Sequence, residues 1–303
     1  MRAHVDEVLL PVYDVDEIWH YSAAGPALSI LRNQRIFASS VAMLNDSGEL
    51  AFGIDILMDA FERRSRQEDY SFMDEIREIL AGGFNMARAR SGFFVACASM
   101  LGDSLSQFRA YGSYALALNP RDNLTPYEVP AADDDPPHIQ TQVRDGFLAG
   151  WRPVMYVSDR DDNDDFEDTA SRLFTRLDSL SERAEAARAE GNFNEADVQD
   201  ASARTLFITV AAHIKHSAFG DEHEVRYFGQ IPLTSRPVQL RDSRLGITPY
   251  VELGNNEQTH IVTAANVGPG LPDTDAAIFG LKSAATHLRL PDFEVWATNY
   301  PAR

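Results

Sequence analysis

Residues 92–99 form a dense apolar run that predicts a strand buried inside a sheet. Its central part reads FFVACA, with aromatic and β-branched side chains and no charged group, which is typical of a strand with little exposure to solvent. Cys97 lies in this run and is the only cysteine. An internal disulfide framework is therefore excluded, and the apolar neighbours of Cys97 indicate a buried thiol.

Hydrophobic spacing divides the rest of the chain into further strands and helices. Strands are predicted at residues 17–21, 35–38, 114–118, 153–157, 223–231, 237–241, 248–253, 259–263 and 293–298, and helices at 25–33, 47–63, 71–89, 104–111 and 273–287. We expect the strands to belong to one sheet with flanking helices. This pattern predicts a single α+β domain over residues 1–303.

Residues 166–217 are predicted to be a helical insertion, or helical layer, within that domain. The segment lies between predicted strands, has a break at Gly191-Asn192, and becomes apolar in its second half. The acidic stretch just before it places oxygen-bearing side chains at alternate positions, as a calcium loop does. Asp164 stands where such a loop needs glycine, and Ala170 where it needs a bidentate Glu. We therefore interpret this stretch as a solvated turn.

The charge balance limits the possible partners. With 46 Asp and Glu against 27 Lys and Arg, the net charge is −19, which repels a phosphate backbone and argues against non-specific binding of duplex DNA. No apolar stretch approaches the roughly 18 residues needed to span a bilayer, and the start of the chain does not resemble a signal peptide. We expect a cytoplasmic protein without a membrane partner. The eight histidines are scattered, so no metal site is predicted.

The first candidate for chemistry is the sequence His20-Tyr21-Ser22, where a predicted strand leads into a helix. The two ring nitrogens of His20 can bind a sugar hydroxyl, and the free N–H groups at the start of the helix can bind a polar ligand. A buried histidine paired with the backbone is the alternative.

The second candidate lies in the predicted strand near residue 224. Strand alternation places Glu222, Glu224 and Arg226 on one face and His223 and Tyr227 on the other. If the charged face borders a cleft, the two carboxylates can stabilise a sugar cation, hold a ribose hydroxyl, or act as acid and base. If it faces water, it is an ordinary charged outer surface.

The third candidate is Tyr111, at the end of the short predicted helix 104–111. Asp103 or Ser104 can cap the start of this helix, and Gly112 can end it in a left-handed conformation. Aromatic side chains at helical spacing usually pack in a core. At the helix end, however, the Tyr111 ring can provide a stacking surface for a flat heteroaromatic group such as nicotinamide.

These residues belong to an ordered series of motifs that resembles the bacterial domain of unknown function 2971 family. The matching stretches are residues 20–22 (HYS), 44–49 (LNDSGE), 106–112 (SQFRAYG), Lys215 with 219–226 (FGDEHEVR), 249–251 (PYV) and 299–303 (NYPAR). The chain departs from the pattern at Phe108, where the family has Trp, and in its loosely matching end. Neither departure removes a charged candidate residue.

That family in turn resembles a distant branch of the ADP-ribosyltransferases, whose pocket uses a His, a Tyr and a Glu in that chain order. The resemblance implies a mixed, mostly antiparallel sheet that splits around NAD. It also implies that His20 binds the adenosine-side ribose, the Tyr21 backbone the nicotinamide amide, Tyr111 the nicotinamide ring and Glu224 the nicotinamide ribose. Glu222 is then expected to activate the acceptor. The full set of expected NAD-binding residues is His20, Tyr21, Ser22, Asn45, Arg109, Tyr111 and Arg226. Of these, Asn45, Arg109 and Arg226 are expected, together with Glu222, to shape the acceptor side.

Three functions remain open from the sequence. The leading hypothesis is an NAD-consuming ADP-ribosyltransferase-like enzyme, with a role as a toxin or in phage defence, whose acceptor is a protein side chain, a small molecule or a nucleic-acid base. The second is a catalytically silent module that binds a nucleotide or a partner. The third is a metal-independent hydrolase that uses Glu222 and Glu224 as acid and base.

Overall fold

The computed structural model describes residues 9–11, 15–43, 48–65, 92–127, 147–148, 150–158, 163–243, 245–255 and 260–298. The predicted helix at 71–89, the candidate Asn45 and the final motif at 299–303 lie outside the described residues.

The described chain alternates between strands and helices. The strands are β1 (Ile18–Ser22), β2 (Ile36–Ser40), β3 (Phe93–Ser99), β4 (Tyr114–Leu118), β5 (Thr125–Pro126), β6 (Arg152–Pro153), β7 (Met155–Val157), β8 (Ile214–His216), β9 (Glu224–Gln230), β10 (Val238–Ser243), β11 (Gly246–Gly254), β12 (Val262–Val267) and β13 (Glu294–Ala297). The helices are α1 (Ala24–Asn33), α2 (Glu49–Ser65), α5 (Leu105–Tyr111), α6 (Asp164–Ala189), α7 (Phe193–Ala211) and α8 (Thr274–Leu288), with 3₁₀ helices η1 (Val41–Met43) and η2 (Ser217–Glu222).

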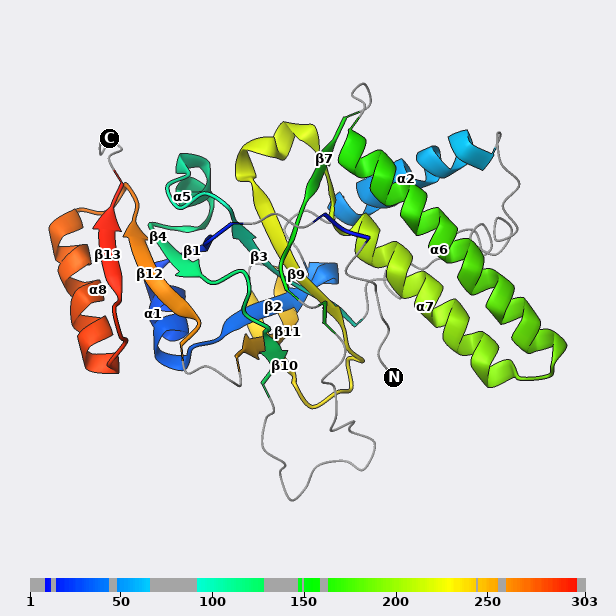
Figure 1. The fold of residues 1–303 in the computed structure, drawn as a ribbon. Helices are drawn as coiled ribbons and strands as arrows, with labels where there is room; N and C mark the ends of the chain where they lie inside the picture. Colours follow the sequence, from blue (N-terminus) through cyan, green and yellow to red (C-terminus); the bar gives the residue numbers. More distant parts are fainter. Residues whose placement is uncertain are drawn as a thin grey trace, which may run out of the picture.

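Eleven of the strands form one mixed, mostly antiparallel sheet. Its main path runs β10-β11-β2-β3-β1-β4-β12-β13, with β5, β6 and β9 paired outside this path. Within it β12 and β13 run parallel, and β7 and β8 form a separate parallel pair. This arrangement, with helices on both sides of the sheet, confirms the predicted α+β class (Figure 1).

The sheet divides at β3. One edge of β3 pairs with β9 along its whole length, from Phe93 to Ser99. The other edge is shared: β2 pairs with Val95 and Phe94, whereas β1 meets β3 only at Ser99. Residues 96–98 therefore have no strand partner on that edge within the described chain. Two groups of strands diverge from this fork, one through β2 and the other through β1.

Different helices cover the two faces of the sheet. On one face, α1 and α8 pack on a core that includes Ile18, Phe94 and Val251. On the other face, α2, α6 and α7 pack against Val95 and Phe228 of β3 and β9. The short helix α5 lies over β1 and β4, where Phe108 contacts the Tyr21 ring at a centroid distance of 4.9 Å. The strong apolar content of β3 is explained by burial on both faces.

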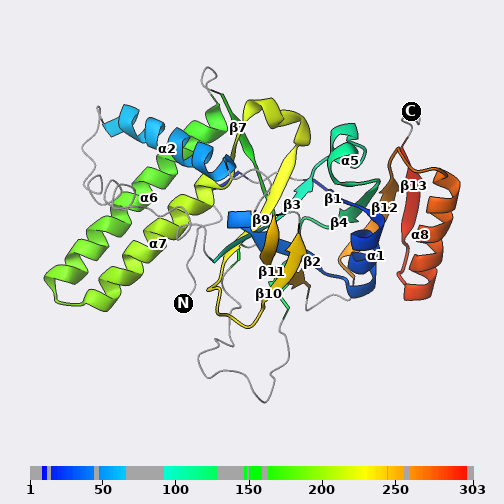
Figure 2. The ribbon, with the colours of Figure 1, turned by 180° about the vertical axis from the view of Figure 1, so that it is seen from behind.

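The helices α6 and α7 occupy most of the segment predicted to be helical. Asn163 and Asn192 cap their starts, because each side-chain oxygen accepts a hydrogen bond from a backbone N–H in the first turn. The two helices form a hairpin that projects from the end of the molecule opposite to α8, as Figures 1 and 2 show. Residues 214–216, which were predicted to be helical, instead form β8, because they pair with β7.

Candidate functional site

Five charged side chains from four elements form a single ionic cluster: Glu49, Lys215, Glu222, Glu224 and Arg226. Glu224 and Arg226 are two residues apart on β9 and therefore project from the same face. Glu49 begins α2, Lys215 lies on β8 and Glu222 ends η2. The cluster thus joins segments that are up to 177 residues apart in sequence.

The prediction for residues 222–228 is correct in part. Glu224 and Arg226 share a face, but Glu222 lies in η2 and precedes the strand. Between them His223 adopts a left-handed conformation with a φ of 44°, which interrupts the alternation. The alternative of a charged outer surface is wrong, because Glu224 is only 7% exposed and Arg226 only 3%.

Arg226 is held by a dense set of acceptors. Its Nε donates to Glu224 Oε1 at 2.7 Å, and its Nη2 to Glu224 Oε2 at 3.0 Å. Nη2 also lies 2.5 Å from Glu49 Oε2. Nη1 donates to the carbonyl oxygen of Ala212, the C-cap residue of α7. A bidentate guanidinium–carboxylate pair of this kind is strongly directional.

Lys215 contacts all three carboxylates of the cluster. Its Nζ is 2.6 Å from Glu222 Oε2, 2.9 Å from Glu49 Oε1 and 3.1 Å from Glu224 Oε2. Burial favours the neutral amine, but Glu224, Glu222 and Glu49 outweigh this effect and raise the pKa of Lys215. The lysine therefore remains charged, and the cluster contains three carboxylates and two cations.

Glu224 is held in its ionised form. Burial by itself raises the pKa of this carboxyl, but Arg226 and Lys215 dominate and lower its pKa to about 2. Its backbone N–H donates to the Tyr156 hydroxyl at 2.8 Å. Burial, in turn, raises the pKa of Tyr156 to about 12, so the phenol remains neutral.

The lowered pKa of Glu224 predicts part of the acid sensitivity of the protein. Since the folded state binds this proton less tightly than the unfolded state, the stabilisation is present above the ordinary pKa of 4.5 and is lost as the pH falls toward about 2. We expect Glu224→Gln to reduce the loss of unfolding free energy over this range. Urea unfolding of the wild type and the variant at a series of pH values measures this loss. If the unfolding free energies of the two proteins fall equally with pH, Glu224 does not have the lowered pKa described above.

Tyr111 lies beside the cluster and is 49% exposed. Burial and then its neighbours Cys97, Glu222 and Glu224 raise its pKa to about 12. The helix that carries Tyr111 lies against η2, on which Phe219 is 40% exposed with its ring centroid 5.0 Å from Lys215 Nζ. Tyr111 and Phe219 are therefore two partly exposed aromatic residues on neighbouring helices, and stacking of a ligand on Tyr111 stays a prediction.

Gly112 fixes the position of Tyr111 relative to β1. Ser104 caps α5, as one of the two predicted caps. Gly112 follows with a φ of 126°, outside the predicted left-handed helical conformation. A Cβ at Gly112 would lie 2.6 Å from the backbone nitrogen of Ala23, so glycine is required for this close approach. Tyr111 is thus held next to the end of the His20-Tyr21-Ser22 segment.

His20 lies at the fork in the sheet. Its Nδ1 is 2.9 Å from the carbonyl oxygen of Cys97, in the stretch of β3 that lacks a strand partner, and Cys97 is directly opposite Arg226. Burial lowers the pKa of His20, which favours the neutral ring. Within the described chain, no side-chain hydrogen bond or ring contact joins His20 to Tyr111 or to Glu224. His20 is therefore separated from the cluster by one strand, and the backbone-paired histidine of the alternative prediction is observed.

The other predicted binding residues have mixed environments. The Tyr21 hydroxyl is used structurally, since it donates to the Leu101 carbonyl oxygen and accepts from the Ser104 N–H. The Ser22 hydroxyl is buried and has no hydrogen-bond partner in the described chain. Arg109 is exposed on α5 and forms no ion pair within the described residues. Asn45 lies outside them.

Lys215, Glu49, Phe219 and Tyr156 were not predicted as site residues. Lys215 follows the apolar sequence ITVAAHI, and a lysine at such a position is a signal of a buried charge partner. Glu49, Lys215 and Phe219 lie in the quoted motifs of the family resemblance, whereas nothing in the sequence around Tyr156 indicates its contact with Glu224.

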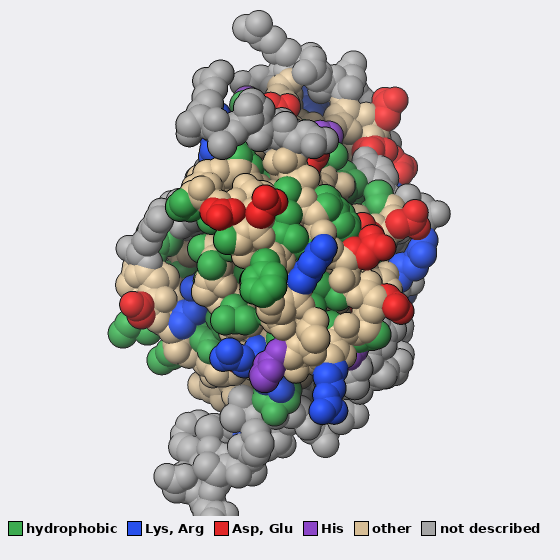
Figure 3. Space-filling view, turned by 90° about the vertical axis from the view of Figure 1, so that its left-hand side faces the viewer, with side chains coloured by type: hydrophobic (Ala, Val, Ile, Leu, Met, Phe, Trp, Pro, Cys, Tyr) green, Lys and Arg blue, Asp and Glu red, His purple; other side chains and the backbone are tan. Residues whose placement is uncertain are grey.

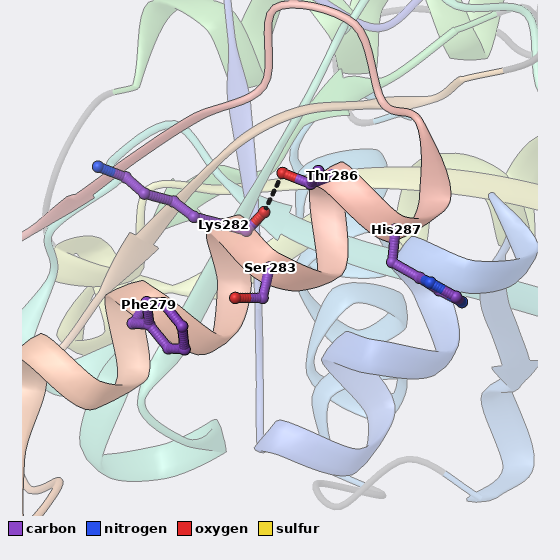
Figure 4. A pocket seen from close by; sticks show the side chains of 5 residues that line it. All are labelled: Phe279, Lys282, Ser283, Thr286 and His287. Carbon is purple, nitrogen blue, oxygen red and sulfur yellow. Dashed lines mark hydrogen bonds between the residues drawn. The ribbon is translucent and has the colours of Figure 1, made fainter.

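Away from the cluster, the described part of the chain has a depression built from one helix. A shallow depression on α8 is lined by Phe279, Lys282, Ser283, Thr286 and His287, all from that single helix (Figure 4). Figure 3 shows the face of the molecule at this end, where apolar side chains are interspersed with both acidic and basic ones. Within the described ranges, no group of three or more His, Cys, Asp or Glu residues is suited to a metal ion. No described helix combines the length and apolar character required to span a membrane.

Comparisons with protein-family models, curated proteins and solved structures find no match for this chain.

Proposed function

We propose that this chain is a cytoplasmic NAD-consuming enzyme of the ADP-ribosyltransferase type, with a role as a toxin or in phage defence. The observation that carries the proposal is the position of Tyr111, a half-exposed residue at the end of α5, which lies against the 3₁₀ helix η2 that carries Glu222. Nicotinamide is a flat ring that carries a positive charge in NAD. An aromatic face next to surplus negative charge is chemically suited to such a ring.

The chemistry of nicotinamide loss also supports the proposal. Departure of nicotinamide leaves positive charge on the ribose, and carboxylates fixed in advance stabilise that charge. The cluster fulfils this requirement, because Arg226 and Lys215 hold its carboxylates in place before any ligand arrives. The fork at β3 is a further point of similarity to a sheet that splits around NAD. His20 lies at this fork, and its Nε2 has no hydrogen bond to the described residues.

The hydrolase alternative is less well supported. Acid–base hydrolysis with two carboxyls needs one of them to hold a proton near neutral pH. The lowered pKa of Glu224 argues against it as that acid, and Arg226 and Lys215 already donate to both of its oxygens. The alternative of a catalytically silent binding module uses the same residues, so only an activity measurement distinguishes it from the enzyme.

The test is release of nicotinamide from NAD by the purified protein, with and without cell lysate as a source of acceptor. Release, with ADP-ribose appearing on a lysate component or in solution, supports the proposal and identifies the acceptor class. Binding of NAD in calorimetry without release favours the silent module. If neither binding nor release is observed, the NAD proposal is wrong.

Tyr111→Ala is expected to lower kcat/KM for nicotinamide release by about tenfold or more, because it removes the stacking surface. Tyr111→Phe keeps the ring and is the matched control, with activity near that of the wild type. Since Tyr111 is half-exposed, the unfolding temperature should change little. Equal activity of the two variants would show that the ring does not contact the substrate.

A further inference from the structure

We propose that Glu222 is the carboxylate that contacts the reacting ribose, and that Glu224 is a positioning residue that acts through Lys215. This inference rests on the proposed function and reverses the roles that the chain order of the motifs implies for the two glutamates. The inference is based on the different exposure and the different hydrogen bonds of the Glu222 and Glu224 carboxylates.

Both oxygens of Glu224 already accept hydrogen bonds from buried cations. Its Oε1 accepts from Arg226 Nε at 2.7 Å, and its Oε2 accepts from Arg226 Nη2 at 3.0 Å and from Lys215 Nζ at 3.1 Å. The side chain is only 8% exposed. A substrate could reach this carboxylate only after breaking a buried ion pair, which is energetically costly.

Glu222 is accessible and only partly occupied. Its Oε2 accepts from Lys215 at 2.6 Å, whereas Oε1 has no hydrogen bond to the described residues. The side chain is 23% exposed. Its backbone is fixed as well, since Ser99 Oγ donates to the Glu222 carbonyl oxygen at 2.7 Å. Glu222 is therefore a held carboxylate with one free oxygen.

Lys215 connects the two roles. The same Nζ binds Oε2 of both glutamates, so the position of Glu222 depends on where Glu224 and Arg226 hold the lysine. Glu49 contributes a third contact to Nζ from the start of α2. Of these three carboxylates, Glu222 is the most exposed. It lies on the same 3₁₀ helix, η2, as Phe219.

The reaction step follows from the free oxygen of Glu222. The bond between ribose C1′ and the nicotinamide nitrogen breaks, and its electron pair leaves with nicotinamide. Positive charge on the ribose is stabilised by the Glu222 carboxylate. A nucleophile of the acceptor, or water, then forms a bond to C1′ and gives its proton to Glu222 Oε1.

The test compares Glu222→Gln and Glu224→Gln, with Glu252→Gln as a control. Glu252 lies on β11 and pairs with Arg35. Glu222→Gln should lower kcat for nicotinamide release by about 100-fold or more and should lower the unfolding temperature by less than Glu224→Gln does, because Glu222 is the more exposed partner of Lys215. Glu224→Gln should lower the unfolding temperature, but below that temperature its kcat should fall by less than about tenfold. The reverse pattern of kcat overturns the inference.

A second measurement does not depend on NAD. Carbodiimide coupling of an amine to the folded wild-type protein, followed by peptide mass spectrometry, should modify Glu222 well before Glu224. Equal modification of the two residues overturns the inference even if the enzyme is active. If the wild type releases no nicotinamide, the proposed function and the reaction step fail together, whereas selective modification still supports Glu222 as the carboxylate that faces a ligand.

Discussion

Arg226→Met is expected to lower the free energy of unfolding by about 3–5 kcal/mol. The substitution keeps much of the side-chain volume but removes the guanidinium that contacts Glu224, Glu49 and the Ala212 carbonyl oxygen. Three carboxylates would then share only Lys215, in a site where water replaces few of the lost hydrogen bonds. Urea unfolding at neutral pH measures the change.

Arg35→Met is the matched control for this prediction. Arg35 also pairs with a glutamate, Glu252, at 2.9 Å, but the two side chains are 28% and 19% exposed. Because partly exposed pairs contribute about 0–1 kcal/mol, this variant should remain close to the wild type. If the two variants lose similar amounts of unfolding free energy, burial does not determine how much the ionic cluster contributes to stability.

Gly112→Ala is expected to cost roughly 3 kcal/mol of unfolding free energy and to reduce nicotinamide release. Two effects combine: the φ of 126° is unfavourable for an L-residue with a side chain, and the new Cβ would meet the Ala23 backbone at 2.6 Å. Relief of that contact requires α5 to move away from β1, and Tyr111 moves with it. Urea unfolding measures the loss of stability, and the nicotinamide assay measures the loss of activity.

Gly280→Ala is a suitable comparison, because Gly280 lies within α8 and a Cβ there meets no atom within 4 Å. Alanine has the higher helix propensity, so this variant should gain up to about 1 kcal/mol. If Gly112→Ala is equally well tolerated, the close packing of α5 on the β1–α1 turn does not fix the position of Tyr111.

Local patterns predicted much of the fold, because burial and capping leave clear signals in sequence. The run at 92–99 is a strand buried on both faces, and α5 begins after the predicted cap Ser104. The segment 214–216 was assigned to a helix because its apolar character continues from α7. Only its pairing with β7, about 60 residues earlier, makes it a strand, and such long-range pairing has no local pattern.

The candidate site shows the same limit. Alternation correctly placed Glu224 and Arg226 together, but it could not anticipate the left-handed conformation of His223, which moves Glu222 off the strand. The order His20, Tyr111, Glu224 carried no information on distance. In the structure, Tyr111 lies near the ionic cluster, whereas His20 is held at the fork by the Cys97 carbonyl oxygen.

The hydrogen bond from Arg226 to the Ala212 carbonyl oxygen connects the site to the projecting α6–α7 hairpin. The end of α7 carries partial negative charge, which a guanidinium neutralises. Ligand contacts that redistribute charge around Arg226 therefore change the strength of this helix cap. Amide hydrogen exchange in the last turn of α7 should report occupancy of the site, which gives a readout of binding that requires neither turnover nor a known acceptor.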